Sequence, residues 1–343
     1  MPFREVKKDA KPKFVDKSKP STHDPEPPTK QGLQLSSPAI LSLGFLALIV
    51  MGTVLLSLPI ATIQPISILA AAFTATSAVT VTGLNVVDTA NYTTFGQLVI
   101  AALIQFGGLG FMTFAILVLT SLQGKMGLSG SITAQEALGT HSNQIGSTAK
   151  AVIKIAFITE SLGFLGLTLL LAPLKGLKDA MYEAFFLCIS AFNNAGFALN
   201  GNNMTAYVHQ PMISFIISLL IITGGIGFLV ILDIIKHKRW QKFTLHTKVM
   251  VLGTLALNII GCILYWLLER HNAKTIGGLS EAGQWFASWF MAVASRTAGV
   301  NNVGFSPVAG ARTFLAFLLV FIWAGAIVTG GGVKIGCLVI ILA

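Results

Sequence analysis

Long apolar runs separated by short polar stretches dominate the chain beyond residue 35 and predict membrane-spanning helices. Runs long enough to span cover 38–58, 95–121, 150–173, 211–235, 247–268 and 313–343. About 20 helical residues are enough to cross the hydrocarbon core of a bilayer. Ser36 or Ser37 is expected to cap the first helix, with Pro38 in its first turn and Pro59 after its end.

Three shorter apolar segments lie between these runs. The first covers 67–79, the second runs from its expected cap Asp179 to Phe192, and the third is opened by Ser280 and Glu281 and continues to Ala294. Each leads into a turn with one glycine: Val81-Thr82-Gly83, Asn194-Ala195-Gly196 and Thr297-Ala298-Gly299. This pattern predicts half-helices that enter the membrane and turn back, which is possible where irregular backbone lines a cavity.

The order span, half-helix, turn, span occurs three times. In the first two copies the closing span also carries a similar glycine cluster: Gly107, Gly108 and Gly110, and then Gly224, Gly225 and Gly227. These coincidences indicate an internal duplication, and small residues of this kind favour close packing of spans. The predicted organisation is a disordered basic tail over 1–35, pore repeats over 36–121, 150–235 and 247–343, and cytoplasmic linkers over 122–149 and 236–246.

Composition supports an all-α polytopic membrane protein. Hydrophobic residues make up 54% of the chain and charged residues only 10%, and the mean hydropathy is +0.76. A single soluble core could not bury this much apolar surface. The three cysteines, Cys188, Cys262 and Cys337, lie in apolar stretches, so packing is a better interpretation than a disulfide framework. The sequence has no cluster of metal ligands or catalytic nucleophile, which argues against an enzyme.

The net charge of +10 sets topology rather than pointing to nucleic acid. Lys and Arg gather in 1–35 and in the linker between Lys236 and Lys248, as expected for cytoplasmic segments. Residues 84–94 and 198–210, which follow the first two turns, are almost uncharged and are expected outside. The N-terminus is therefore predicted to be cytoplasmic.

The three turns predict a cation site built from backbone oxygens. A cation at membrane depth needs oxygens in place of its hydration shell, and carbonyl groups supply them. Aiming those carbonyls at one axis needs a conformation open mainly to glycine, and the partly negative C-terminal ends of the half-helices also favour cations. Thr82, Asn194 and Thr297 can add or brace oxygens. The candidate ion-binding residues are Val81, Thr82, Gly83, Asn194, Ala195, Gly196, Thr297, Ala298 and Gly299.

A single glycine in each turn predicts few well-formed ion sites and therefore weak discrimination between potassium and sodium.

Four segments resemble the Trk/Ktr/HKT superfamily of potassium transporters and are most similar to bacterial KtrB membrane subunits. They are Thr76–Leu84, Ile104–Phe114, Ile189–Phe197 and Ser295–Gly299. The likeness covers 36–343. The absence of an extra helix pair ahead of residue 38 favours the Ktr branch.

The resemblance implies potassium uptake, often stimulated by sodium, without a cofactor. It also implies a homodimer in the bacterial plasma membrane, gated by a cytoplasmic nucleotide-binding subunit of the KtrA type. The glycine-broken last span would be an intramembrane gating loop that includes Gly325, Gly330, Gly331 and Gly332. Ile327 and Val328 stand where the family loop is usually small and polar.

The family closes a pseudo-fourfold pore with four repeats, and this sequence shows three. We expect the gene to continue through a fourth repeat, and residues 1–343 alone not to conduct. Besides a cation conduit, the sequence leaves open an alternating-access carrier and a truncated, non-conducting subunit or scaffold. The carrier fits less well because its repeats would be inverted, whereas these share one orientation.

Charged residues near the membrane have structural interpretations. Glu160, deep in a span, is expected to pair with another helix rather than touch the ion. Glu183 is expected in the first turn of its half-helix, where it offsets the helix dipole, and Asp233 near Lys236 at a helix end. Arg296 is expected to brace the third turn from behind.

Overall fold

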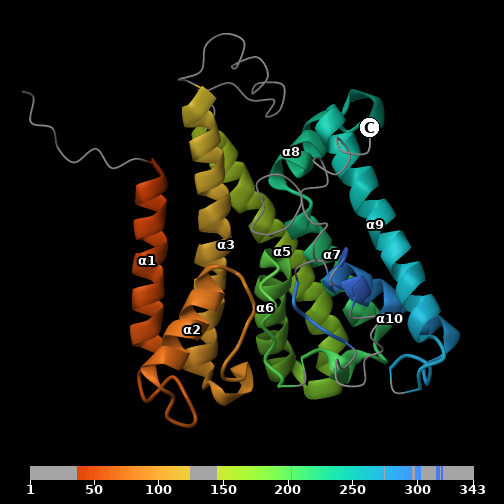
Figure 1. The fold of residues 1–343 in the computed structure, drawn as a ribbon, viewed down its shortest axis with the longest axis horizontal. Helices are drawn as coiled ribbons and strands as arrows, with labels where there is room; N and C mark the ends of the chain where they lie inside the picture. Colours follow the sequence, from red (N-terminus) through yellow and green to blue (C-terminus); the bar gives the residue numbers. More distant parts are fainter. Residues whose placement is uncertain are drawn as a thin grey trace, which may run out of the picture. The chain divides into compact units, whose positions relative to one another are not determined.

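The structure is a computed structural model that describes residues 37–123, 145–201, 203–273, 275–295, 298–302, 314–316 and 318–319. Its long and medium helices are α1 (Ser37–Leu56), α2 (Ile68–Val79), α3 (Thr94–Gln123), α5 (Ile145–Lys175), α6 (Leu177–Asn193), α7 (Pro211–Gly225), α8 (Phe228–His237), α9 (Leu245–Glu269) and α10 (Glu281–Ala294) (Figure 1). Short 3-10 turns cover Thr89–Asn91, Thr205–Tyr207 and Trp240–Lys242. Within these ranges the only strand-like pairing is an isolated bridge between Thr62 and Tyr92.

The first repeat consists of α1, α2 and α3, which pack against one another (Figure 1). Ser67 caps α2, because its hydroxyl oxygen accepts a hydrogen bond from the amide of Ala70. The small side chains of Ala71 and Ala75 are fully buried. At 12 residues, α2 is much shorter than α1 and α3, with 20 and 30 residues, as expected for a half-helix between two spans.

The second repeat corrects two predictions. Asp179 does not cap α6: the helix begins at Leu177 after Gly176, whose φ of +83° lets the chain reverse directly after α5. Asp179 lies in the first turn instead, where its charge offsets the helix dipole. The predicted single span over 211–235 is broken into α7 and α8, which meet at an angle of 94°. Gly227, with φ +102°, lies at this break because a nonhelical backbone there favours glycine.

The third repeat begins with α9, and α10 packs against both α9 and α7. Ser280 caps α10 as predicted, its hydroxyl accepting from the amide of Gly283 at 3.2 Å. Trp266 of α9 and Trp285 of α10 stack with ring centroids 4.7 Å apart. Of the predicted last span, only 314–316 and 318–319 are described, and they are helical.

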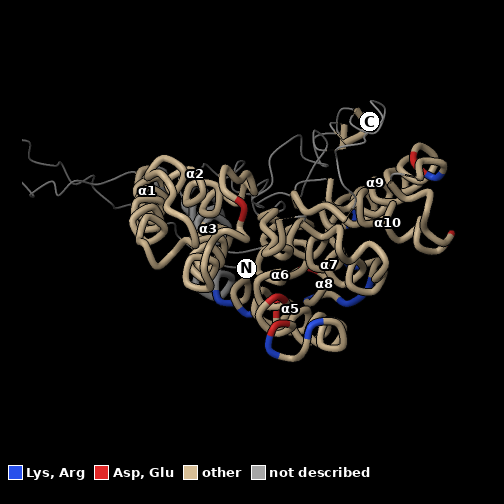
Figure 2. The backbone as a smooth tube through the Cα atoms, turned by 90° about the horizontal axis from the view of Figure 1, so that it is seen from below, with Lys and Arg blue, Asp and Glu red and all other residues tan. Residues whose placement is uncertain are grey.

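The described helices have the length and composition of a membrane protein. The stretches Lys150–Lys175 and Leu245–Glu269 are long and apolar enough to cross a bilayer, and the bent pair of α7 and α8 adds a third if it counts as one span. Most of the described backbone carries no charged side chain (Figure 2). Many large apolar side chains on α1, α5 and α9 are exposed, as expected for surfaces that face lipid.

Candidate functional site: three converging glycine turns

The first two turns share one backbone design. At the end of α2, Thr82 N donates to Ser77 O, and at the end of α6, Ala195 N donates to Ser190 O, both at 2.8 Å. These bonds span the same number of residues and close a Schellman-type helix end. In both turns the residue two positions before the glycine is left-handed: Val81 with φ +55° and Asn194 with φ +58°.

Left-handed backbone is common for Asn but strained for a β-branched residue such as Val81. The three turn glycines all have the positive φ that the sequence predicts: +82° at Gly83, +77° at Gly196 and +66° at Gly299. The tertiary structure therefore requires two special conformations in each of the first two turns, where the sequence indicated only the glycine.

The three glycines, far apart in the chain, converge in space. A β-carbon added to Gly196 would lie 3.2 Å from Gly83 Cα and 3.1 Å from Gly299 Cα. Gly196 therefore lies between the other two. A side chain at any of the three positions would crowd the space between the glycines. It would also require a non-glycine residue to adopt a positive φ, which is strained.

Carbonyl oxygens also converge there. A β-carbon added to Gly83 would lie 2.5 Å from the carbonyl oxygen of Ala195. One added to Gly196 would lie 3.1 Å from the carbonyl oxygen of Ala298. Each oxygen belongs to the residue just before a turn glycine and approaches the glycine of the preceding repeat. The arrangement thus places neutral oxygen acceptors from successive repeats around one region, as cation coordination requires.

The glycine clusters hold the half-helix ends. A β-carbon at Gly107 of α3 would collide with the carbonyl oxygen of Val79, and one at Gly224 of α7 would collide with that of Phe192. At Gly108 it would collide with the side-chain oxygen of Asn193. Close packing, which the sequence favoured for these clusters, therefore applies to Gly107, Gly108 and Gly224.

Side chains brace the second turn from within its own repeat. The hydroxyl of Ser190 donates to Phe197 O at 2.6 Å, which ties the residues on either side of the turn. The amide of Asn194 donates to Phe192 O at 3.4 Å and to Ile221 O of α7 at 3.5 Å. Asn194 thus braces the turn from behind with its side chain. In the first turn the hydroxyls of Thr80 and Thr82 bond to each other at 2.7 Å.

The third turn is held by the loop of the second repeat. Asn203, itself left-handed with φ +55°, accepts from the amide of Asn301 at 3.1 Å and donates to Gly299 O at 3.5 Å. Met204 N also donates to Asn301 O at 2.9 Å. The sequence does not predict this contact, and its only local signal is the tolerance of Asn for left-handed backbone.

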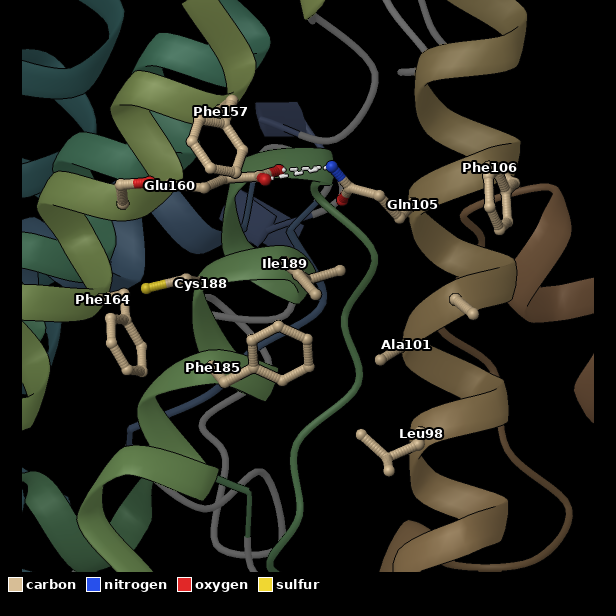
Figure 3. A pocket seen from close by; sticks show the side chains of 12 residues that line it. Leu98, Ala101, Gln105, Phe106, Phe157, Glu160, Phe164, Phe185, Cys188 and Ile189 are labelled. Atoms are coloured by element: carbon tan, nitrogen blue, oxygen red, sulfur yellow. Dashed lines mark hydrogen bonds between the residues drawn. The ribbon is translucent and has the colours of Figure 1, made fainter. Parts of the chain in front are cut away.

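Glu160 has the kind of partner that the sequence predicts, whereas Glu183 differs from the prediction in position and Asp233 in its neighbours. Both carboxyl oxygens of Glu160 accept from Gln105 of α3 at 3.0 Å, as the predicted pairing with another helix requires (Figure 3). Glu183 lies in the second turn of α6, not the first, because α6 begins at Leu177. Asp233 bonds His237 at 2.6 Å and receives two hydrogen bonds from Thr244 at 3.0 Å, so it ties α8 to the start of α9 rather than to Lys236.

Glu183 is the centre of a buried polar cluster outside the turns. Its carboxylate pairs with Lys175 at 2.6 Å and accepts from Asn200 at 3.0 Å and from the Tyr207 hydroxyl at 2.6 Å. Burial raises the pKa of Tyr207 to about 12, together with the Glu183 carboxylate that accepts a hydrogen bond from the Tyr207 hydroxyl.

Several of the predicted residues lie outside the described residues: Arg296, Thr297, Gly325, Gly330, Gly331 and Gly332.

Comparison with known proteins identifies the family. The model of the TrkH family, described as a cation transport protein, matches residues 39–343. The chain belongs to the TrkH cation transport family. It is therefore a membrane protein of a transporter family, and its all-α polytopic fold class is confirmed.

The similar TrkH-family members include potassium transport proteins. The chain is 43% identical over 313 residues to the Ktr system potassium uptake protein B of Bacillus subtilis, covering 90% of this chain and 70% of that protein. It is 40% identical to the protein of the same name from Vibrio alginolyticus, covering 87% and 66%. The potassium/sodium uptake protein NtpJ of Enterococcus hirae is 34% identical, with 90% and 69% covered.

A solved structure has the same fold. The potassium transporter TrkH from Vibrio parahaemolyticus superimposes with a TM-score of 0.67 at 21% identity, covering 91% of this chain and 62% of the TrkH chain. At this identity the likeness concerns the fold alone.

Proposed function

We propose that the chain takes up potassium through a filter formed by backbone carbonyl groups of the glycine turns. The observation that carries the proposal is the convergence of Gly83, Gly196 and Gly299, with the carbonyl oxygens of Ala195 and Ala298 between them. Potassium uptake in the names of the B. subtilis and V. alginolyticus relatives supports potassium as the substrate. Thr82 and Thr297 complete the proposed filter.

Sodium enters the proposal in two ways. A single glycine in each turn favours fewer carbonyl sites and therefore modest selectivity for potassium over sodium. The E. hirae relative is named for both ions, which supports sodium as a second ion or an activator. We propose no cofactor.

The regulation that we propose follows the Ktr relatives, whose names describe a system. The chain would act as a homodimer in a bacterial plasma membrane, with its N-terminus and a nucleotide-binding partner in the cytoplasm.

The gating loop would include Gly325 and Gly330–Gly332. Deleting that loop should raise the uptake rate and leave the ion preference unchanged, and a folded deletion variant no faster than the parent would contradict gating.

The filter is tested by Gly196→Ser in the full protein with its partner subunit. Uptake of potassium and of sodium is measured in cells that lack their own potassium uptake. Because Gly196 has φ +77° and two neighbouring glycines in contact range, the variant should lose potassium uptake or its preference over sodium. Gly44→Ser is the matched control, since Gly44 has open space around its β-position. Uptake unchanged for both ions in Gly196→Ser would overturn the proposal.

A further inference from the structure

Three polar side chains connect the first two repeats by hydrogen bonds beside the second turn. Gln105 of α3 donates from Nε2 to both carboxyl oxygens of Glu160 on α5, at 3.0 Å each (Figure 3). Oε1 of Gln105 accepts from Nδ2 of Asn193 at 2.8 Å. Asn193 is fully buried and is the last residue of α6. The contacts therefore run from α5 through α3 to the residue just ahead of the turn.

These hydrogen bonds lie in apolar surroundings. Gln105 and Glu160 border a groove of about 440 Å³ between α3, α5 and α6, and Phe106, Phe157 and Phe185 also line it (Figure 3). Apart from Ser161 and Cys188 the rest of the lining is apolar and offers few competing polar partners, so a lost hydrogen-bond partner here is costly.

The orientation of the Gln105 amide follows from its two partners. Because Nε2 faces the carboxyl oxygens of Glu160, Oε1 is left to face Asn193. If the Gln105 amide were flipped, its NH2 group would face the NH2 group of Asn193. Its oxygen would then face the carboxyl oxygens of Glu160, so neither contact could be a hydrogen bond. Asn193 Nδ2 also donates to Ile189 O at 3.0 Å. Glu160 thus selects one orientation of Gln105, and Gln105 in turn selects one orientation of Asn193.

We propose that Gln105 is a positioning residue for ion selectivity, which fixes Asn193, and with it the second turn, against the first repeat. This rests on the proposed filter function. Directly after Asn193 come left-handed Asn194 and then Ala195, whose carbonyl oxygen lies against Gly83. A filter discriminates between ions by the number and placement of its oxygens, so a small movement of this turn changes the preference between potassium and sodium.

The first test is Gln105→Leu in the full protein with its partner subunit. This variant removes all three hydrogen bonds of Gln105, two to Glu160 and one from Asn193, but retains a side chain of similar size. The measured quantities are the potassium-to-sodium uptake ratio, and KM and maximal rate for each ion, at matched amounts of protein in the membrane. One lost hydrogen bond corresponds to roughly a tenfold change in an equilibrium, so we expect the ratio to fall by about that factor through KM. A purely structural role would lower the amount of protein or the maximal rate for both ions alike.

An exchange of the two groups provides the rescue. Gln105→Glu sets a second carboxyl group against Glu160 and should reduce the ratio at least as much as Gln105→Leu. Adding Glu160→Gln should restore it, because the glutamine at 160 can donate to the carboxylate at 105, which still accepts from Asn193. Glu160→Gln alone should have little effect, since an amide oxygen can accept from Gln105.

Phe106→Leu is the control, since Phe106 is the neighbour of Gln105 on α3, lines the same groove and is 62% exposed. The proposal is overturned if the Gln105 variants keep the parental ratio, or if adding Glu160→Gln fails to restore the ratio of Gln105→Glu. If Gln105→Leu does not reach the membrane, the exchange pair decides. If Gly196→Ser abolishes selective uptake while the Gln105 variants keep the ratio, the filter stands and only the role of Gln105 fails.

Discussion

Gly107 of α3 lies so close to Val79 that a β-carbon on the glycine would overlap the carbonyl oxygen at the end of α2. The second repeat has the same relationship between Gly224 of α7 and Phe192 of α6. Val79 and Phe192 occupy equivalent positions before their turn glycines. In both of these repeats the closing span contacts the carbonyl end of its own half-helix through a residue with no side chain, which explains why a glycine recurs at these two positions.

This packing predicts that Gly107→Ala and Gly224→Ala destabilise the protein. The added methyl group meets backbone oxygen, which cannot move aside like a flexible side chain, and overpacking of this kind costs about 1–3 kcal/mol. The measurement is the midpoint of thermal unfolding of purified protein in detergent. Gly110→Ala is the control on the same helix, because nothing lies within 4 Å of its β-position. Equal midpoints for all three variants would show that α3 and α7 can move away from the half-helices.

A second prediction concerns Asn203, which bonds both Asn301 and Gly299 of the third turn. Asn203→Ala removes both side-chain contacts and places Ala in a left-handed backbone conformation, which costs roughly 1–2 kcal/mol. If the turns form the ion filter, the third turn loosens and the potassium-to-sodium uptake ratio falls. Asn85→Ala, in an exposed loop position of the first repeat, is the control. A parental ratio in Asn203→Ala would show that the third turn keeps its geometry without this side chain.

A third prediction concerns the pair of Lys175 and Glu183. The Glu183 side chain is 7% exposed, so Lys175→Met leaves a buried carboxylate without its cation. Two hydrogen bonds to Glu183 remain, from Asn200 and Tyr207, and the Lys175 side chain is 34% exposed. We therefore expect a loss of about 2 kcal/mol, below the range for fully buried pairs. Lys178→Met, at an exposed position nearby, should change the unfolding midpoint little, and a similar fall in both variants would contradict the prediction.

A fourth prediction concerns alkaline pH. The pKa of Tyr207 is raised from 10.0 to about 12 in the folded protein, first by burial and then by its hydrogen bond to Glu183. Because the folded state holds the proton more tightly, this contribution to stability is complete below pH 10 and is lost as the pH rises toward 12. The free energy of unfolding should fall by about 2 kcal/mol over that interval. In Tyr207→Phe, measured in parallel, this part of the decline should be missing, and an equal decline would assign it to other groups.

Much of the described fold could be predicted from local pattern. Apolar length separates the spans from the half-helices, and the sequence placed α2 and α10 within a residue or two of their observed bounds. Local pattern is not enough where the role of a residue depends on the element before it. Asp179 looked like a cap because it is the usual residue type, but Gly176 allows the helix to begin earlier. The bend at Gly227 was hidden in an apolar run that is long enough to span.

By itself, the sequence determined the membrane class, the repeated order of spans and half-helices, and the need for a special backbone conformation at the turn glycines, because these depend on hydrophobic length and on the freedom of glycine. The tertiary structure alone decided which groups meet. Examples are the contact of Gly107 with Val79, the bonds of Asn203 to Asn301, and the amide of Gln105 between Glu160 and Asn193. Such contacts join residues far apart in the chain, and they depend on the packing of whole helices, which no local pattern encodes.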